Sequence, residues 1–430
     1  MINDITSFPD GSRIDDWFYD INIPDIETLG KQYHFNEYGI FLSEHVQTKS
    51  IQSLIDRVAG EGGGVIVVDP GVYISGALNF KNGVNLYLSE GAVLKGSDDI
   101  CDFPVTFTRI EGQSCDYFPA LINADGMDGF VIAGSGVLDG NGLRYWKQFW
   151  CRRAWNKECT NKDEQRPRLV FISNSRDVTV CGVTMRDSAF WTNHLYKCER
   201  VRYIDCRITS PHEPVGAPST DAIDIDACRM VHVKNCYMAV NDDAVALKGG
   251  KGPDADSAKE NGANERVIIE DCDFGFCHGC LTFGSESIHD NNIILRNITV
   301  DTGYNMLWLK MRPDTPQCYE NVLVENVSGH AANFLNINPW RQFFDAKGKA
   351  IPPSLCRNIT LKDCTFTCDT YFNVNTDPSQ FILKDFTFKN LSVCAADIGF
   401  DGSVFDGYTE EDIVLSKKDD VAFPDSITTL

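Results

Sequence analysis

The amino-acid sequence predicts an all-β solenoid, a parallel β-helix built from stacked coils. Seven short β-rich segments each contain an Asn or Asp followed by an apolar residue, and they recur every 26 to 37 residues. The polar positions are Asp205, Asn235, Asp271, Asn297, Asn326, Asp363 and Asn390. Asn and Asp suit tight turns, and the apolar residue that follows can stack inside the coil. Helical repeats of this period would need longer runs at 3.6-residue spacing, and these segments are too short and too β-branched.

One amphipathic helix precedes the solenoid. Its apolar residues are spaced i, i+3, i+4, i+7, and the glycine-rich stretch 60–64 ends it. These apolar residues are Ile51, Leu54, Ile55 and Val58. The open end of a solenoid is an exposed strand edge, so we expect this helix to cap it.

Strand signals dominate the rest of the chain. The segments 65–69, 84–88, 130–134 and 178–182 are short, β-rich and bounded by Gly, Asn or Asp. We therefore expect three parts. The N-terminal extension and capping helix occupy residues 1–60, one β-helix domain occupies 61–400, and a tail at 401–430 packs on the solenoid.

Composition excludes several classes of partner. The chain has 430 residues and a net charge of −22, which disfavours nucleic acid and anionic membranes. It has no apolar run long enough to span a bilayer. The first residues lack the features of a signal peptide, which favours the cytoplasm; export with the signal already removed is the alternative. The oligomeric state is not predictable.

The cysteines and the glycosylation motifs are expected to be structural. The 17 cysteines are an odd number, and we expect most to be buried thiols rather than zinc-type C-x-x-C pairs. Four N-x-S/T motifs begin at Asn297, Asn326, Asn358 and Asn390. At least three of them lie in the repeat register, so we interpret these asparagines as turn residues.

An acidic cluster is the main candidate for chemistry. Asp221 ends Ser219-Thr220-Asp221, and Asp242 and Asp243 follow about one coil later. Adjacent coils lie about 4.8 Å apart, so three carboxylates would crowd one face. Crowding raises at least one pKa, and a protonated acid beside ionised carboxylates is what glycoside hydrolysis requires. A solvated acidic face or a calcium site is the alternative at this point.

Three further motifs follow the acidic pair, and the ordered set carries a resemblance. They are Cys277-His278-Gly279, Gly284-Ser285-Glu286 and Trp308-Leu309-Lys310. The whole order resembles glycoside hydrolase family 28, the polygalacturonase family, over roughly residues 60 to 400. The resemblance implies a right-handed, single-stranded β-helix and an inverting hydrolase of acidic pectic substrates that needs no cofactor or metal.

The resemblance also implies roles for individual residues. Asp242 matches the general acid, and Asp221 and Asp243 match the pair that activates water. His278 matches the histidine that tunes the acid, and Lys310 matches a lysine that binds the sugar carboxylate. For inversion, a water must fit between acid and base, so we expect the carboxyls to lie about 6.5–9.5 Å apart.

Trp308 departs from the family pattern, because it stands where the family has an arginine. It replaces a bidentate donor with a stacking surface, so the sugar need not be galacturonate. Arg312 lies two residues beyond Lys310 on the same strand, and we expect it to restore part of the lost charge.

The glycine-rich stretch 248–265 lies between the acidic pair and His278, and it resembles text in exo-acting members of the family. We expect it to close one end of the cleft. Lys248 and Lys251 within it are candidates for holding an acidic sugar, and so is Glu286, which also resembles those members. His194 lies one coil before Asp221 and is a further candidate for the sugar site, with a structural histidine as the alternative.

Three rival functions remain open. A polysaccharide lyase on the same solenoid would use Ca²⁺ held by the carboxylates and a basic residue such as Lys310. A carbohydrate-binding or adhesion solenoid would have no need of the acids and His278 on successive coils. A hydrolase of rhamnogalacturonan or another pectic linkage would keep the acids and differ only in the sugar, as Trp308 suggests.

Overall fold

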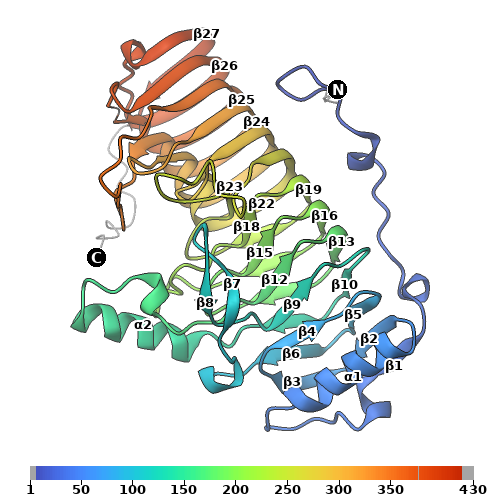
Figure 1. Cartoon of the computed structure of the whole chain (residues 1–430). Helices are drawn as coiled ribbons and strands as arrows, with labels where there is room; N and C mark the ends of the chain where they lie inside the picture. The colour runs from blue at the N-terminus through green and yellow to red at the C-terminus, as the bar shows by residue number, and fades with distance from the viewer. Residues whose placement is uncertain (1–5, 376, 419–430) are drawn as a thin grey trace.

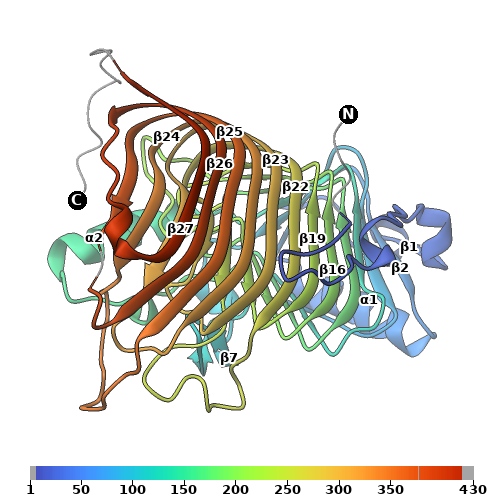
Figure 2. The ribbon, with the colours of Figure 1, turned by 90° about the horizontal axis from the view of Figure 1, so that it is seen from above.

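Strands stack in parallel along most of the chain, and successive coils present the same three faces (Figure 1, Figure 2). The computed structural model describes residues 6–375 and 377–418. Each strand pairs with the equivalent strand of the next coil, as in the parallel pairing of Ile223 with Val245. The predicted fold, an all-β right-handed parallel β-helix, is confirmed.

Three rows of strands form the first coils. The front row, which carries the acidic cluster, is β4 (Leu78–Phe80), β9 (Ile122–Asp125), β12 (Val170–Ser173), β15 (Asn193–Tyr196), β18 (Ile223–Asp226) and β21 (Val245–Lys248). A second row is β1 (Gln32–His34), β2 (Gly64–Val68), β5 (Val84–Leu88), β10 (Val131–Gly134), β13 (Arg176–Cys181), β16 (Glu199–Ile204) and β19 (Arg229–Lys234). The third row is β3 (Gly71–Ser75), β6 (Ala92–Gly96), β11 (Val137–Asp139), β14 (Thr184–Arg186), β17 (Arg207–Thr209) and β20 (Tyr237–Ala239).

The later coils run as long bent strands that continue these rows. They are β22 (Asn264–Phe283), β23 (His289–Met311), β24 (Cys318–Pro339), β25 (Ser354–Val374), β26 (Phe381–Asp397) and β27 (Phe405–Lys417). β27 pairs in parallel with β26, so the stacking of strands continues beyond residue 400.

The predicted turn register has a direct structural basis. All seven Asn and Asp residues of the register have φ between 48° and 55°, in the left-handed region that Asn and Asp tolerate. Their side chains also bond from coil to coil, as in the 2.8 Å contact from Asn297 Nδ2 to Asp271 Oδ1. The residue after each turn is buried in the core, as predicted. Asn358, the sequon outside the seven-residue register, is likewise in the left-handed region, which supports a turn role for all four.

Helices and short segments cover the solenoid. α1 (Thr48–Gly60) buries the predicted stripe against the first strands and caps the coil end (Figure 1). α2 (Leu143–Trp155) projects from the third-row side of the molecule. The 3₁₀ turns are Asp16–Phe18, Ile26–Leu29, Phe35–Tyr38, Ile100–Asp102, Asn161–Asp163 and Gly402–Val404. Residues before α1 lie along the second row, where Phe8, Ile14 and Phe18 pack on Met230 and Ile294.

An antiparallel hairpin stands apart from the coils. It consists of β7 (Thr106–Ile110) and β8 (Gln113–Tyr117), and Figure 1 shows it over the front row. Arg109 of the hairpin is buried and pairs with Asp226 of β18 through distances of 2.9 and 3.2 Å. The hairpin therefore covers the front row on the N-terminal side of the acidic cluster.

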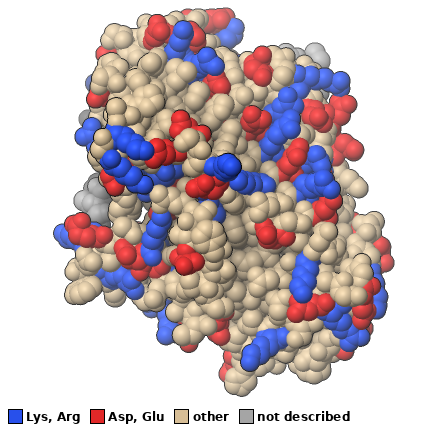
Figure 3. Space-filling model, viewed as in Figure 1, with Lys and Arg blue, Asp and Glu red and all other residues tan. Residues whose placement is uncertain are grey.

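Charges of both signs are interspersed on the face shown in Figure 3, and no large basic patch forms there. All 17 cysteines are free thiols, and most are buried, as predicted. Within the described residues, no helix is long and apolar enough to cross a membrane.

Candidate active site

The three predicted acids meet at one end of the front row. Asp221 precedes β18, and Asp242 and Asp243 precede β21. Because Ile223 pairs with Val245, Asp221 and Asp243 lie level on adjacent coils. One carboxylate oxygen from each of the three acids lies within 4.8 Å of those of the other two. The predicted crowding of carboxylates is therefore present.

The separation of the acids differs from our expectation for inversion. The nearest oxygens are within 4.8 Å, whereas the expected separation was about 6.5–9.5 Å. The physical reason is the coil spacing, since level positions on stacked strands lie about 4.8 Å apart. Asp242 and Asp243 are consecutive residues, so their carboxyl groups are also close to each other.

Exposure distinguishes the three acids. The side chains of Asp221 and Asp243 are 4% and 1% exposed, whereas that of Asp242 is 25% exposed. His278 is 29% exposed, and its Nδ1 lies 3.7 Å from Asp242 Oδ1. Asp242 and His278 are therefore the members of the group that a substrate can reach.

Burial and mutual repulsion raise the pKa values of two of the acids. Burial, followed by the charge of Asp243, raises the pKa of Asp242 to about 6. Burial, followed by the charge of Asp242, raises the pKa of Asp221 to about 8. Burial lowers the pKa of His278, so its imidazole is neutral near neutral pH. The cluster therefore retains protons at mildly acidic pH.

Close packing against the acids requires a glycine at position 279, directly after His278. A Cβ atom at this position would lie 2.1 Å from Thr282 Oγ1 and 2.8 Å from Asp243 Oδ1. The backbone N–H of His278 also donates to the carbonyl of Asp242 at 2.8 Å. This close approach of β22 to the acids holds the imidazole beside Asp242.

Two lysines neutralise the cluster. Lys310 Nζ lies 2.9 Å from Asp243 Oδ2. Lys248 is buried, with Nζ 3.7 Å from Asp221 Oδ2, 3.6 Å from Asp224 Oδ1 and 3.7 Å from Glu286 Oε2. Lys248 is therefore an internal counter-ion rather than a free cation. The ammonium groups of Lys248 and Lys310 would repel a divalent cation bound by the three acids. That the protein needs no metal remains a prediction.

Aromatic residues form the side of the site on later coils. Lys310 Nζ lies 4.0 Å from the ring centre of Trp308 and 4.9 Å from that of Trp340. The two indoles meet edge to face, with ring centres 5.5 Å apart. Trp340 follows β24 and belongs to no motif, so no pattern in the sequence points to it. The ring of Tyr304 lies 4.9 Å from that of His278 and was missed for the same reason.

Arg312 is not placed as expected. It is fully buried, and its guanidinium binds both carboxylate oxygens of Asp314 at 2.8 Å. The guanidinium charge is therefore already paired, and it presents no free donor to a sugar carboxylate.

His194 does not line the sugar site. It is fully buried beneath the hairpin, with Nδ1 2.7 Å from Arg168 Nη1 and Nε2 3.3 Å from Asp226 Oδ2. Burial lowers its pKa to about 4. The structural reading of His194, which the sequence left open, is the one that this geometry supports.

Glu286 and Lys251 lie where the hairpin tip meets the inserted stretch. The carbonyl of Glu286 accepts from the N–H groups of Gly249 and Gly250 at 2.7 and 3.0 Å. Gly112 at the hairpin tip fits closely here, because a Cβ on it would lie 2.9 Å from atoms of Glu286 and Gly250. The inserted stretch and the hairpin are thus in contact beside the acids.

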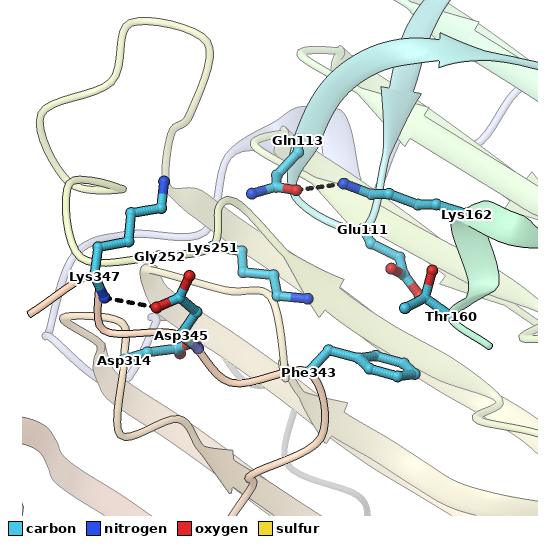
Figure 4. A pocket seen from close by; sticks show the side chains of 10 residues that line it. All are labelled: Glu111, Gln113, Thr160, Lys162, Lys251, Gly252, Asp314, Phe343, Asp345 and Lys347. Carbon is cyan, nitrogen blue, oxygen red and sulfur yellow. Dashed lines mark hydrogen bonds between the residues drawn. The ribbon is translucent and has the colours of Figure 1, made fainter. Parts of the chain in front are cut away.

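Figure 4 shows the pocket next to this junction, with Lys251 projecting into it between Glu111 and Phe343. Within the described residues, Lys251 makes no hydrogen bond or ion pair, and its Nζ lies 5.8 Å from the ring centre of Phe343. Lys162 in the same pocket bonds to Gln113. Lys251 therefore presents to this pocket an ammonium group that no described residue pairs.

Cys277 and Cys280 form a C-x-x-C pair, so the expectation that the cysteines include no such close pair is wrong. Both are fully buried, with sulfur atoms 3.7 Å apart, and they flank His278 and Gly279. The hydrogen bond with Cys280, followed by burial, raises the pKa of Cys277 well above its ordinary value. The pair is a core contact of thiols, which agrees with the general expectation for the cysteines.

The fold and the cluster together define a parallel β-helix with an acid-rich site on its front row. The model of glycosyl hydrolases family 28 matches residues 92–394. The chain therefore belongs to that family, as the sequence motifs indicated.

Relatives of known sequence agree with this assignment. An endo-polygalacturonase from Pectobacterium parmentieri is 26% identical over 270 residues, which cover 60% of this chain and 63% of that protein. A probable polygalacturonase from Vitis vinifera is 26% identical over 221 residues, covering 49% of this chain and 43% of that protein. The match spans less than two thirds of the length of either relative.

Solved structures share the fold. An exopolygalacturonase from Thermotoga maritima superposes with a TM-score of 0.73 at 21% identity, covering 92% of this chain and 93% of the other. A family 28 exopolygalacturonase from Yersinia enterocolitica gives a TM-score of 0.63 at 17% identity, with 90% and 78% covered. At these identities the likeness establishes the architecture alone.

Proposed function

We propose that the protein is an inverting, exo-acting glycoside hydrolase that releases galacturonic acid from pectin-derived oligosaccharides. The observation that carries the proposal is the cluster of three carboxylates within 4.8 Å, with one partly exposed acid and two adjacent lysines. Membership of family 28 supports hydrolysis as the reaction.

Asp242 is the proton donor in this proposal. It is the most exposed of the three acids, and its pKa of about 6 keeps it protonated in mildly acidic solution. Asp243 accepts a hydrogen bond from Lys310 Nζ at 2.9 Å and activates water in this proposal. Asp221, buried and level with Asp243, holds the same water, and the neutral imidazole of His278 orients Asp242 and the sugar.

The proposal of inversion is based on the family resemblance and on the different roles assigned to the three acids. Two of them hold the water, while Asp242 faces the glycosidic oxygen from the open side. Among enzymes that use two catalytic carboxyls, a short separation between the carboxyl groups is typical of a retaining mechanism. Proton NMR of the first product therefore tests this part of the proposal. An α-linked substrate yields the β-anomer first under inversion, and the α-anomer would assign one aspartate as a nucleophile.

Exo action is supported by the hairpin β7–β8. It covers β15 and the end of β18 through Arg109 and Asp226, and its tip meets the inserted stretch at Gly250. A sugar chain extending along the front row from the acids would meet this wall within one coil. The open side lies over β22, β23 and β24, where Trp308 and Trp340 stand.

The acidic sugar is held by a lysine in this proposal. Lys310 stays paired with Asp243 beside the acids, so the sugar carboxylate is held by Lys251, which lies with Glu286 on the far side of the site near the hairpin tip. A specific observation favours a second candidate, hydrolysis of rhamnogalacturonan or another pectic linkage. The indoles of Trp308 and Trp340 offer stacking surface on the open side, where an arginine would favour a second uronate.

The test is a product assay on tetragalacturonate and on a rhamnogalacturonan oligosaccharide, each with and without EDTA. Reducing ends, product size and absorbance of unsaturated products are followed together. The proposal expects early release of saturated galacturonate monomer, unaffected by EDTA. An early ladder of mid-sized products would refute exo action, and unsaturated products lost with EDTA would indicate a lyase. Binding of both sugars without any cleavage would favour a carbohydrate-binding solenoid.

A further inference from the structure

We propose that the chain carries a second carbohydrate-binding site, specific for neutral sugars, on the other side of the hairpin from the acids. The site is a cavity of about 440 Å³ over the front row at β9, β12 and β15. That volume lies within the range of about 300–1,000 Å³ typical of ligand pockets. Residues 106–109 of the hairpin line this cavity, whereas the hairpin tip meets Glu286 and Gly250 beside the acids, so the hairpin lies between the cavity and the candidate active site.

Aromatic rings supply the apolar surface of this cavity. Phe107 of the hairpin is 72% exposed and lines it, together with Phe171 of β12 and Tyr196 of β15. A guanidinium lies over each of the two floor rings, with Arg168 4.1 Å from the centre of Phe171 and Arg109 4.9 Å from the centre of Tyr196. These contacts hold the floor rings in place, while Phe107 is free to stack on a ligand.

Amide and carboxylate groups supply the polar surface. Asp125 Oδ1 accepts from Ser173 Oγ at 2.8 Å and from Asn174 Nδ2 at 2.7 Å, while Oδ2 has no protein partner among the described residues. The amide of Asn79 likewise makes no side-chain hydrogen bond among the described residues, and both residues are exposed. Rings beside unpaired amide and carboxylate oxygens match a ligand that combines apolar faces with many hydroxyl groups, which is the chemistry of a sugar.

The charge of the lining excludes an acidic sugar. Among the described residues, Arg109 is the one cationic residue of the lining, and it is buried and already paired with Asp226. Arg168, over the ring of Phe171, is also buried and bonds to Thr108 and His194. Asp125 would repel a carboxylate and can accept from neutral hydroxyls. The ligand is therefore a neutral oligosaccharide chain, in contrast to the acidic sugar proposed for the catalytic cleft.

The site stands independently of the proposed catalytic function. It would hold a neutral chain against the enzyme while the hairpin keeps that chain away from the acids. Cleavage of short acidic oligosaccharides should not depend on it.

Isothermal titration of the full chain with galactotetraose and arabinotetraose tests the site, with tetragalacturonate as the acidic comparison. We expect saturable binding of at least one neutral probe, undiminished in the presence of excess tetragalacturonate. Phe107→Ala should weaken that binding about tenfold, or about 1.4 kcal/mol, because it removes the ring that stacks on the sugar. Phe41→Ala removes a ring that is 62% exposed elsewhere and is the matched control, which should bind as the wild type does.

Thermal unfolding of both variants shows whether they remain folded, and this control does not depend on the proposed catalytic activity. No saturable binding of either neutral probe would overturn the proposal. So would equal loss in Phe107→Ala and Phe41→Ala, or displacement of the neutral probe by tetragalacturonate, which would place the neutral sugar in the catalytic cleft.

Discussion

The proposed role of Asp242 as the proton donor predicts how cleavage depends on pH. Burial and the charge of Asp243 raise its pKa from 3.8 to about 6. A raised pKa keeps the carboxyl protonated at higher pH, so activity that needs the proton is present below pH 6 and lost above it. With a pKa of about 6, about 90% of Asp242 is protonated at pH 5, about 10% at pH 7 and about 1% at pH 8.

The assay is kcat/KM on tetragalacturonate between pH 5 and pH 8, with Asp242→Asn as the perturbation. We expect the wild type to lose about tenfold per pH unit above pH 6, and Asp242→Asn to lose about 10²–10⁴-fold at pH 5. The asparagine keeps the shape of the side chain, so the thermal unfolding temperature should stay close to that of the wild type. Asp301→Asn changes an exposed acid on β23 and is the matched control. A flat profile to pH 8, or near-normal turnover by Asp242→Asn, would refute the assignment of the acid.

Further variants address specificity, geometry and stability. Trp308→Arg should raise kcat/KM on tetragalacturonate relative to a rhamnogalacturonan oligosaccharide, since it restores a carboxylate donor; an unchanged ratio would mean that the position does not touch the sugar. Gly279→Ala should lower kcat at least about tenfold, because its Cβ would lie 2.8 Å from Asp243 Oδ1, and unimpaired turnover would show that the strand can move aside. Arg109→Met should destabilise the protein by about 3–5 kcal/mol in urea unfolding, because Asp226 would be left buried and unpaired. Adding Asp226→Asn should recover part of that loss, and a single variant as stable as the wild type would contradict the argument.

Local chemistry made much of the fold and part of the site predictable. The turn residues from Asp205 to Asn390 could be predicted because few residues other than glycine, Asn and Asp adopt the left-handed conformation readily. The buried face of α1 could be predicted because the spacing of its apolar residues matches the helical period. The crowding of Asp221 with Asp242 and Asp243 follows from their separation by about one coil.

Other features depend on contacts that no local pattern reports. Arg312 lies on the expected strand, yet its charge is paired with Asp314 two residues later. His194 lies on the expected coil, yet the hairpin covers it. Trp340 joins Trp308 from the next coil without belonging to any motif.

The sequence by itself determined the class of fold, the family and the three acids, because turn conformation, coil period and motif order are local properties of the chain. Only the tertiary structure decided which charged groups remain free and which segments cover the front row. Both depend on segments distant in sequence, such as the hairpin around Arg109 and the stretch around Lys251, that fold back over the front row. Their position depends on ion pairs and close backbone contacts between those segments, which spacing along the chain does not encode.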